Sequence, residues 1–259
     1  MASWNESPVE VAGGKLNIRR AGKGRPLLVV HRDIGTLDRL PFYDALAERF
    51  DVLVPDHPGY GKSERATWMR HPRDIAVIYR GILAEMGLED PILVGLGFGG
   101  WIAAEMATMA PGDLGALVLV GPMGIKPPEG DILDQALLSY IDYARASFSD
   151  DKAFDAVYGA EPTTDQLVEW DVCREMNFRI AWKPYMFSLS LPHLLGSVRA
   201  PTVIAWGEDD KVVPRSAAAL WQKGLPHARL EVVPACGAAV EMEKPDVLTK
   251  LVLDVAGNR

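Results

Sequence analysis

The sequence predicts one α/β domain built on a mostly parallel sheet with helices on both faces. Short apolar runs alternate with segments of helical periodicity along much of the chain, and this alternation is typical of βαβ units. The later runs show no polar alternation, which favours strands buried on both faces. A chain of 259 residues, 48% of them hydrophobic, suits a single domain with an insertion better than two separate domains.

The first half of the chain holds most of the predicted elements. Alternating polarity around Gly13 and Gly14 predicts an opening hairpin. Apolar runs then predict buried strands, and spacings of three and four residues predict helices. In chain order we expect a strand at 26–30, a helix at 40–50, a strand at 52–54, a helix at 73–87 and strands at 91–94 and 117–120.

A helical insertion is predicted where the alternation stops, from Gly121 to about Leu195. Apolar spacing from Ile132 to Ala144 predicts one amphipathic helix. A capping box at 163–166 opens a second helix. The sheet resumes at 203–206 and 230–233, and a helix at 246–255 closes the chain. We therefore expect a core of residues 1–122 and 196–259, with a small helical cap at 123–195.

Composition and charge exclude several classes of partner. Asp and Glu outnumber Lys and Arg by 35 to 27, and no basic stripe is present to neutralise phosphates. No apolar run approaches the roughly 20 residues of a membrane span, and the first residues do not read as a signal peptide. We expect a cytoplasmic protein with two free thiols, Cys173 and Cys236. We expect a small-molecule ligand and neither nucleic acid nor membrane, and we leave a homodimer open.

Neither a metal nor a cofactor is predicted. No spacing of Cys, His and Asp is typical of a metal site. The glycines 95, 97 and 100 formally match a dinucleotide-binding pattern. That pattern belongs after the first strand of a domain, whereas this turn follows a late strand.

A glycine-dense turn joins the strand at 91–94 to a helix of small residues. Its pattern, Gly95-x-Gly97-x-Gly99, is typical of a nucleophile elbow, except that the elbow carries Ser at its middle position. Glycines on either side allow the helix to pack closely against the strand.

With this turn, the chain resembles the α/β-hydrolase superfamily over almost its whole length. It is most similar to small-capped members related to meta-cleavage product hydrolases and esterases. The resemblance implies an α/β-hydrolase fold. Five features in order carry it: the His31 loop, the loop 56–63, the glycine turn, the segment 206–214 and the segment 234–245.

The resemblance implies positions for a catalytic triad, two of which are vacated. The nucleophile maps to Gly97 and the histidine to Ala238, while the acid maps to Asp210, with Asp209 as the alternative. The Phe98 N–H and an N–H from the Arg32–Asp33 segment would form an oxyanion hole. Such a hole still binds a carbonyl oxygen or a carboxylate without cleaving anything.

The loop His31-Arg32-Asp33 also departs from the His-Gly usual in the family. In a functional interpretation, Arg32 clamps an anionic ligand and Asp33 moves a proton, with His31 and Trp101 beside the same ligand. In the structural interpretation, which we favour, Arg32 and Asp33 point to solvent and pair with each other, while His31 holds the turn.

Three functional hypotheses follow. In the first, which we favour, the protein has lost hydrolysis and binds a small hydrophobic, carbonyl or carboxylate ligand under the cap, with Asp210 or Asp33 available for non-hydrolytic proton chemistry. In the second, it is an ester or C–C bond hydrolase inactivated by substitution at Gly97 and Ala238. In the third, it is a scaffold without a ligand.

Overall fold

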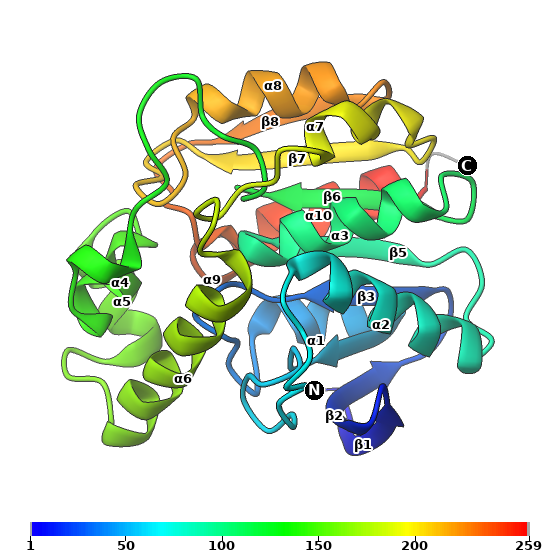
Figure 1. Cartoon of the computed structure of the whole chain (residues 1–259), viewed down its shortest axis with the longest axis horizontal. Coiled ribbons are helices and arrows are strands. Elements are labelled where there is room, and N and C mark those ends of the chain that lie inside the picture. The colour runs from blue at the N-terminus through cyan, green and yellow to red at the C-terminus, as the bar shows by residue number, and fades with distance from the viewer. Residues whose placement is uncertain (1, 258–259) are drawn as a thin grey trace.

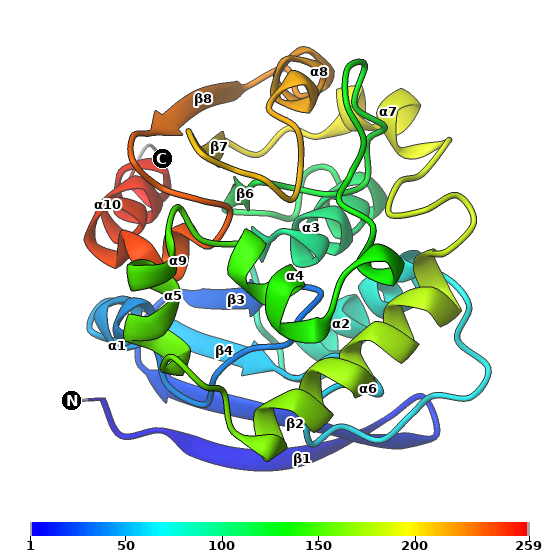
Figure 2. The same cartoon turned by 90° about the vertical axis from the view of Figure 1, so that its left-hand side faces the viewer.

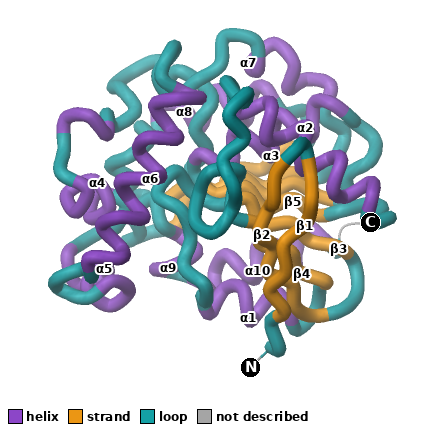
Figure 3. Tube along the Cα trace, turned by 60° about the horizontal axis from the view of Figure 1, so that its bottom comes forward, coloured by secondary structure: helices purple, strands orange, loops and turns teal. Residues whose placement is uncertain are grey.

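The computed structural model describes residues 2–257 and confirms the α/β class. Within that range a single sheet contains the strands β1 (Asn5–Val11), β2 (Gly14–Gly22), β3 (Pro26–Val30), β4 (Asp51–Pro55), β5 (Ile92–Leu96), β6 (Ala116–Val120), β7 (Thr202–Gly207) and β8 (Ala228–Val233). Their spatial order is β1-β2-β4-β3-β5-β6-β7-β8 (Figure 1). From β4 to β8 in this order all neighbours run parallel, and the two antiparallel pairs are β1 with β2 and β2 with β4. Figure 3 shows these two strands at one edge of the sheet.

Helices cover both faces of the sheet, as the sequence predicts. They are α1 (Pro41–Ala47), α2 (Pro72–Glu85), α3 (Phe98–Met109), α4 (Tyr140–Ala146), α5 (Asp151–Tyr158), α6 (Thr164–Ala181), α7 (Leu191–Leu194), α8 (Ser216–Gly224), α9 (Val240–Glu243) and α10 (Pro245–Ala256), with 3-10 turns at Gln135–Leu137 and Leu195–Ser197. Helices α1 and α10 bury their apolar sides against one face, and α2, α3 and α8 bury theirs against the other. This arrangement agrees with the α/β-hydrolase fold that the resemblance implies.

The central strands show why their sequences lack polar alternation. In β5, Ile92, Val94 and Leu96 belong to the core on the α1 and α10 side. Leu93 belongs to the core on the opposite side, with α2 and α3. Because both faces are covered, every residue of β5 is buried, and an apolar side chain is favoured at every position.

The single helix predicted from Ile132 to Ala144 is wrong. A 3-10 turn occupies Gln135–Leu137, Leu138 is extended, and α4 begins only at Tyr140. The Ser139 Oγ accepts a hydrogen bond of 3.1 Å from the Asp142 N–H and so caps the start of α4. Apolar spacing alone does not reveal such a cap. The other predicted strands and helices are present, with ends shifted by a few residues.

Helices α4, α5 and α6 belong to the segment between β6 and β7 and lie beyond the carboxyl ends of the parallel strands (Figures 1 and 2). Helix α7, at the end of the same segment, lies beside α8 instead. The boundaries of a separate cap at 123 and 195 stay a prediction. In residues 2–257, no helix combines the length and the apolar composition that crossing a bilayer would take.

The close packing of α3 on β3 depends on Gly99, and this generates a first prediction. A Cβ at Gly99 would lie 2.0 Å from the backbone oxygen of Val30, so we expect Gly99→Ala to reduce the free energy of unfolding by about 1–3 kcal/mol or more. Gly81, in α2, has no atom within 4 Å of its Cβ position. Gly81→Ala is the matched control and should raise stability by about 0.5–1 kcal/mol. Urea unfolding of both variants measures this, and equal stabilities would contradict the packing account.

Candidate functional site

Gly97 lies at the sharp turn between β5 and α3, where its backbone adopts φ 53° and ψ −111°. This conformation is in the left-handed half of φ space, which favours glycine. The turn is held by backbone hydrogen bonds, from the Gly97 N–H to Val120 O at 2.8 Å and from the Met123 N–H to Gly97 O at 3.0 Å. The sequence therefore builds the elbow geometry although no side chain projects from it.

Arg32 and Asp33 occupy the space above Gly97. A Cβ placed on Gly97 would lie 3.0 Å from Arg32 Nη1 and 3.7 Å from Asp33 Oδ1. Both side chains belong to the loop that leaves β3, and both residues are only 3% exposed. Their expected position in solvent is therefore wrong. The hydrogen bonds of each side chain go to other residues rather than to its neighbour, so the expected pairing of Arg32 with Asp33 is wrong as well.

Arg32 forms a buried two-pronged ion pair with Glu241, at the start of α9. The Arg32 Nε donates to Glu241 Oε1 at 2.6 Å, and Nη2 donates to Glu241 Oε2 at 2.9 Å and to the carbonyl oxygen of Ala238. Burial acts to lower the pKa of Arg32, but Glu241, Asp210 and Asp33 together raise it above its ordinary value. Arg32 is therefore a fixed cation that spans the two positions where the resemblance places nucleophile and histidine.

Asp33 connects the sheet to the helical insertion. Its Oδ2 accepts hydrogen bonds of 2.6 Å from Gln135 Nε2 and 2.6 Å from the Tyr143 hydroxyl. Its backbone oxygen accepts from Asn177 Nδ2 at 2.8 Å. Burial raises the pKa of Asp33, while the Tyr143 hydroxyl and the charge of Arg32 oppose that rise. This carboxylate is thus committed to partners within the protein.

His31 is part of the same loop, and its ring forms hydrogen bonds with backbone atoms. Its Nε2 accepts a hydrogen bond of 2.9 Å from the His57 N–H, so its Nδ1 carries the proton and donates to Arg32 O at 2.7 Å. The two imidazole rings are stacked with centroids 3.5 Å apart. Burial lowers the pKa of His31 to about 4. A neutral His31 therefore fixes the loop that carries Arg32.

Asp210 follows β7 and lies beside the same buried charges. Its Oδ1 accepts from the N–H groups of Val212 and Val213 at 2.8 and 2.9 Å. Although part of the residue reaches the surface, Oδ2 is enclosed and has no hydrogen-bond partner among the described residues. Burial raises the pKa of Asp210 to about 6, against the opposing effects of the two N–H groups and Arg32. Asp209, the alternative acid, is exposed.

The remaining candidates belong to the core around α3. Phe98 is fully buried and its N–H begins α3, next to Gly97. Trp101 packs edge-on against Phe98 with centroids 6.0 Å apart, and its Nε1 donates to Glu105 at 3.2 Å. The structure thus places the Trp101 ring in the packing of α3.

Glu241 is the residue of this site that sequence reasoning missed. It lies three positions after Ala238, between the apolar residues Val240 and Met242, and Glu243 follows two positions later. With a second carboxylate so close, the sequence does not single out Glu241 as the partner of a buried cation.

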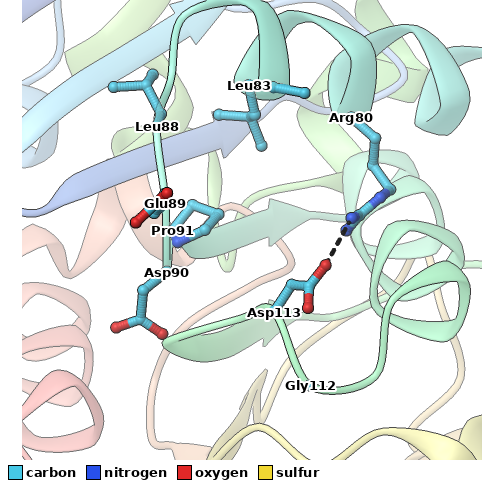
Figure 4. Close-up of a pocket in the computed structure, with 9 residues that line it drawn as sticks. Arg80, Leu83, Leu88, Glu89, Asp90, Pro91, Gly112 and Asp113 are labelled. Atoms are coloured by element: carbon cyan, nitrogen blue, oxygen red, sulfur yellow. Dashed lines mark hydrogen bonds and ion pairs between the residues drawn. The ribbon is translucent and has the colours of Figure 1, made fainter.

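A hollow of about 570 Å³ lies near the carboxyl ends of the parallel strands, between the loops that follow β3 and β4 and helix α6, and Thr36, Asp56 and Glu169 are among the residues that line it. Further hollows lie elsewhere. One of about 410 Å³ lies where Pro91 and Asp113 precede β5 and β6, with an ion pair of 3.2 Å between Arg80 and Asp113 at its edge (Figure 4). This is the amino-terminal end of the parallel strands, whereas ligands of open α/β sheets bind at the carboxyl ends. Within residues 2–257, no group of three His, Cys, Asp or Glu side chains is arranged to hold a metal.

The raised pKa of Asp210 generates a prediction for stability against pH. A carboxyl group whose pKa rises from 3.8 to about 6 on folding stabilises the fold fully below pH 3.8 and loses this contribution as pH rises through 6. Asp210→Asn cannot ionise at this position. We therefore expect its free energy of unfolding to rise by about 3 kcal/mol relative to that of the parent as the pH goes from 4 to 7. Urea unfolding across this range measures the difference. Asp209→Asn is the control. If the free energies of unfolding of both variants depend on pH as that of the parent does, the burial of an ionisable Asp210 is refuted.

Comparisons with known proteins agree with this architecture. The model of the alpha/beta hydrolase family matches residues 27–251. The chain is 28% identical to 2-hydroxy-6-oxo-6-phenylhexa-2,4-dienoate hydrolase of Comamonas testosteroni, over 94% of this chain and 92% of that one. A structure of the enzyme of that name from Rhodococcus sp. strain RHA1 superposes with a TM-score of 0.76 at 20% identity, covering 98% and 99% of the two chains.

A bacterial membrane phospholipase A superposes with a TM-score of 0.81 at 20% identity, covering 99% of this chain and 87% of that one. At such identities the structures show the fold alone, since one fold supports many reactions. The family model, however, spans most of the sequence. The chain therefore belongs to the alpha/beta hydrolase family.

Proposed function

We propose that this protein derives from C–C bond or ester hydrolases and that its own reaction centre does not hydrolyse. The names of the relatives, which describe hydrolases of 2-hydroxy-6-oxo-dienoates, support the origin. The contacts of Arg32 support the loss, and they are the observation that carries the proposal. Its guanidinium lies over Gly97 and donates a hydrogen bond to the carbonyl of Ala238. The Arg32 side chain therefore fills the space between these two positions.

The chemistry of the two substituted positions points in the same direction. Glycine offers no nucleophile, and alanine cannot take a proton from a hydroxyl or a water. Triad members act as a unit, so removing either one removes most of the rate advantage. Asp210 without a histidine to orient has no role in that mechanism.

The hypothesis favoured from the sequence, a ligand site with proton chemistry by Asp33 or Asp210, has less support. Asp33 is occupied by Gln135 and Tyr143, and Arg32 is occupied by Glu241. One observation still favours it, because the enclosed Asp210 Oδ2 has no partner among the described residues. A reaction that depends on this carboxylate would be abolished in Asp210→Asn.

A rescue series tests the proposal. The parent should hydrolyse neither short p-nitrophenyl esters nor 2-hydroxy-6-oxo-6-phenylhexa-2,4-dienoate above the buffer rate. Gly97→Ser/Ala238→His should also be silent, because the new Ser Cβ would lie 3.0 Å from Arg32 Nη1. Adding Arg32→Gly and Glu241→Gln clears the centre without leaving an unpaired charge. We expect the hydrolysis rate of this fourfold variant, which carries all four substitutions, to exceed that of the parent at least about a hundredfold.

Arg32→Gly/Glu241→Gln alone is the matched control and should stay inactive, since it lacks nucleophile and base. Circular dichroism checks that each variant is folded. Hydrolysis by the parent at a rate comparable to the fourfold variant would refute the proposed loss. A folded but inactive fourfold variant would refute descent from a hydrolase whose elbow and acid are still in place.

A further inference from the structure

A separate hollow of about 490 Å³ lies on the surface beside α7 and α8. Three segments form it: the residues that follow β6, the segment 187–193 and the end of α8. Gly124 and Phe187 pair as an isolated parallel bridge, so the two ends of the insertion between β6 and β7 meet at this wall. Figure 1 shows α7 and α8 on the same side of the molecule. None of the residues around Gly97 lines this hollow.

The walls of this hollow are largely hydrocarbon. Ile125, Phe187, Pro192 and the side chains of Leu189 and Leu220 line it. Leu189 is 75% exposed and Leu220 is 38% exposed, which leaves apolar surface in contact with water. Covering such surface is favourable by roughly 25 cal/mol per Å². An occupant with an aliphatic part would therefore gain affinity here.

The ionisable side chains that line this hollow are all basic. Lys126, His193 and Lys223 all line the hollow, and no Asp or Glu does. None of these three side chains forms an ion pair with another described residue. The protein as a whole carries a net charge of −8, so a lining with cations alone runs against its composition. Such a lining attracts an anion and disfavours a cation.

We propose that this hollow binds an amphipathic monocarboxylate, that is, an aliphatic chain that ends in a carboxylate. The chain packs against Phe187, Leu189 and Leu220, and the carboxylate lies within reach of the free ammonium groups of Lys126 and Lys223. A volume of about 490 Å³ is in the range of pockets that hold small ligands. The site is independent of the function proposed for the centre at Gly97.

Calorimetric titration with sodium octanoate, below its micelle-forming concentration, tests the proposal. We expect saturable binding of one octanoate per chain, with octylamine not binding and 1-octanol binding more weakly. Lys126→Glu/Lys223→Glu should weaken octanoate binding at least tenfold. Lys152→Glu/Lys250→Glu is the matched control, because it makes the same change in net charge at exposed lysines elsewhere and should bind like the parent.

A second variant tests the apolar wall. Leu220→Asn keeps the cations and should weaken octanoate and 1-octanol in the same proportion. The proposal is overturned if octanoate does not bind, if octylamine binds as tightly, or if both lysine pairs affect binding equally. Association with phosphatidylglycerol vesicles without binding of monomeric octanoate would also overturn it, since the hollow would then be part of a membrane-contacting surface.

Discussion

The ion pair between Arg32 and Glu241 is the interaction on which the rest of this site depends. Taking two charges out of water is costly, and only a well-matched partner offsets that cost. Here the guanidinium meets both carboxylate oxygens and a backbone carbonyl. Arg32 follows β3 and Glu241 is the second residue of α9, so the pair joins the first part of the chain to the last. Losing Glu241 would leave Arg32 with only the charges of Asp33 and Asp210 near it, and losing Arg32 would leave Glu241 without its partner.

Small residues make room for this pair. Gly97 has no side chain to meet Arg32 Nη1, and Ala238 leaves its carbonyl open to Nη2. The resemblance of the sequence places the nucleophile and the base of an active hydrolase at these two positions. Gly97 and Ala238 thus allow one buried network to form around Arg32 and Glu241. Asp33 extends it by bonding to Gln135 and Tyr143, which fixes the insertion over the filled centre.

The fold was predictable because its signals are local. Apolar runs such as Ile92–Leu96 and the glycines of the elbow need no knowledge of distant residues. The boundary at Ser139 was missed because one hydroxyl bond overrides apolar spacing. The positions of Gly97, Ala238 and Asp210 came from a resemblance. The orientation of Arg32 was not predictable, because its partner is 209 residues away in sequence, and a charged loop residue far more often faces solvent.

A thermodynamic cycle at Arg32 and Glu241 tests the central claim most directly. The free energy of unfolding would be measured in urea for the parent, Arg32→Met, Glu241→Leu and the double variant. Each single change should cost about 3–5 kcal/mol, because it leaves one buried charge unpaired. The double variant should cost at least about 2 kcal/mol less than the sum of the two. Costs that add within about 0.5 kcal/mol would contradict the account, since the two side chains would then not depend on each other.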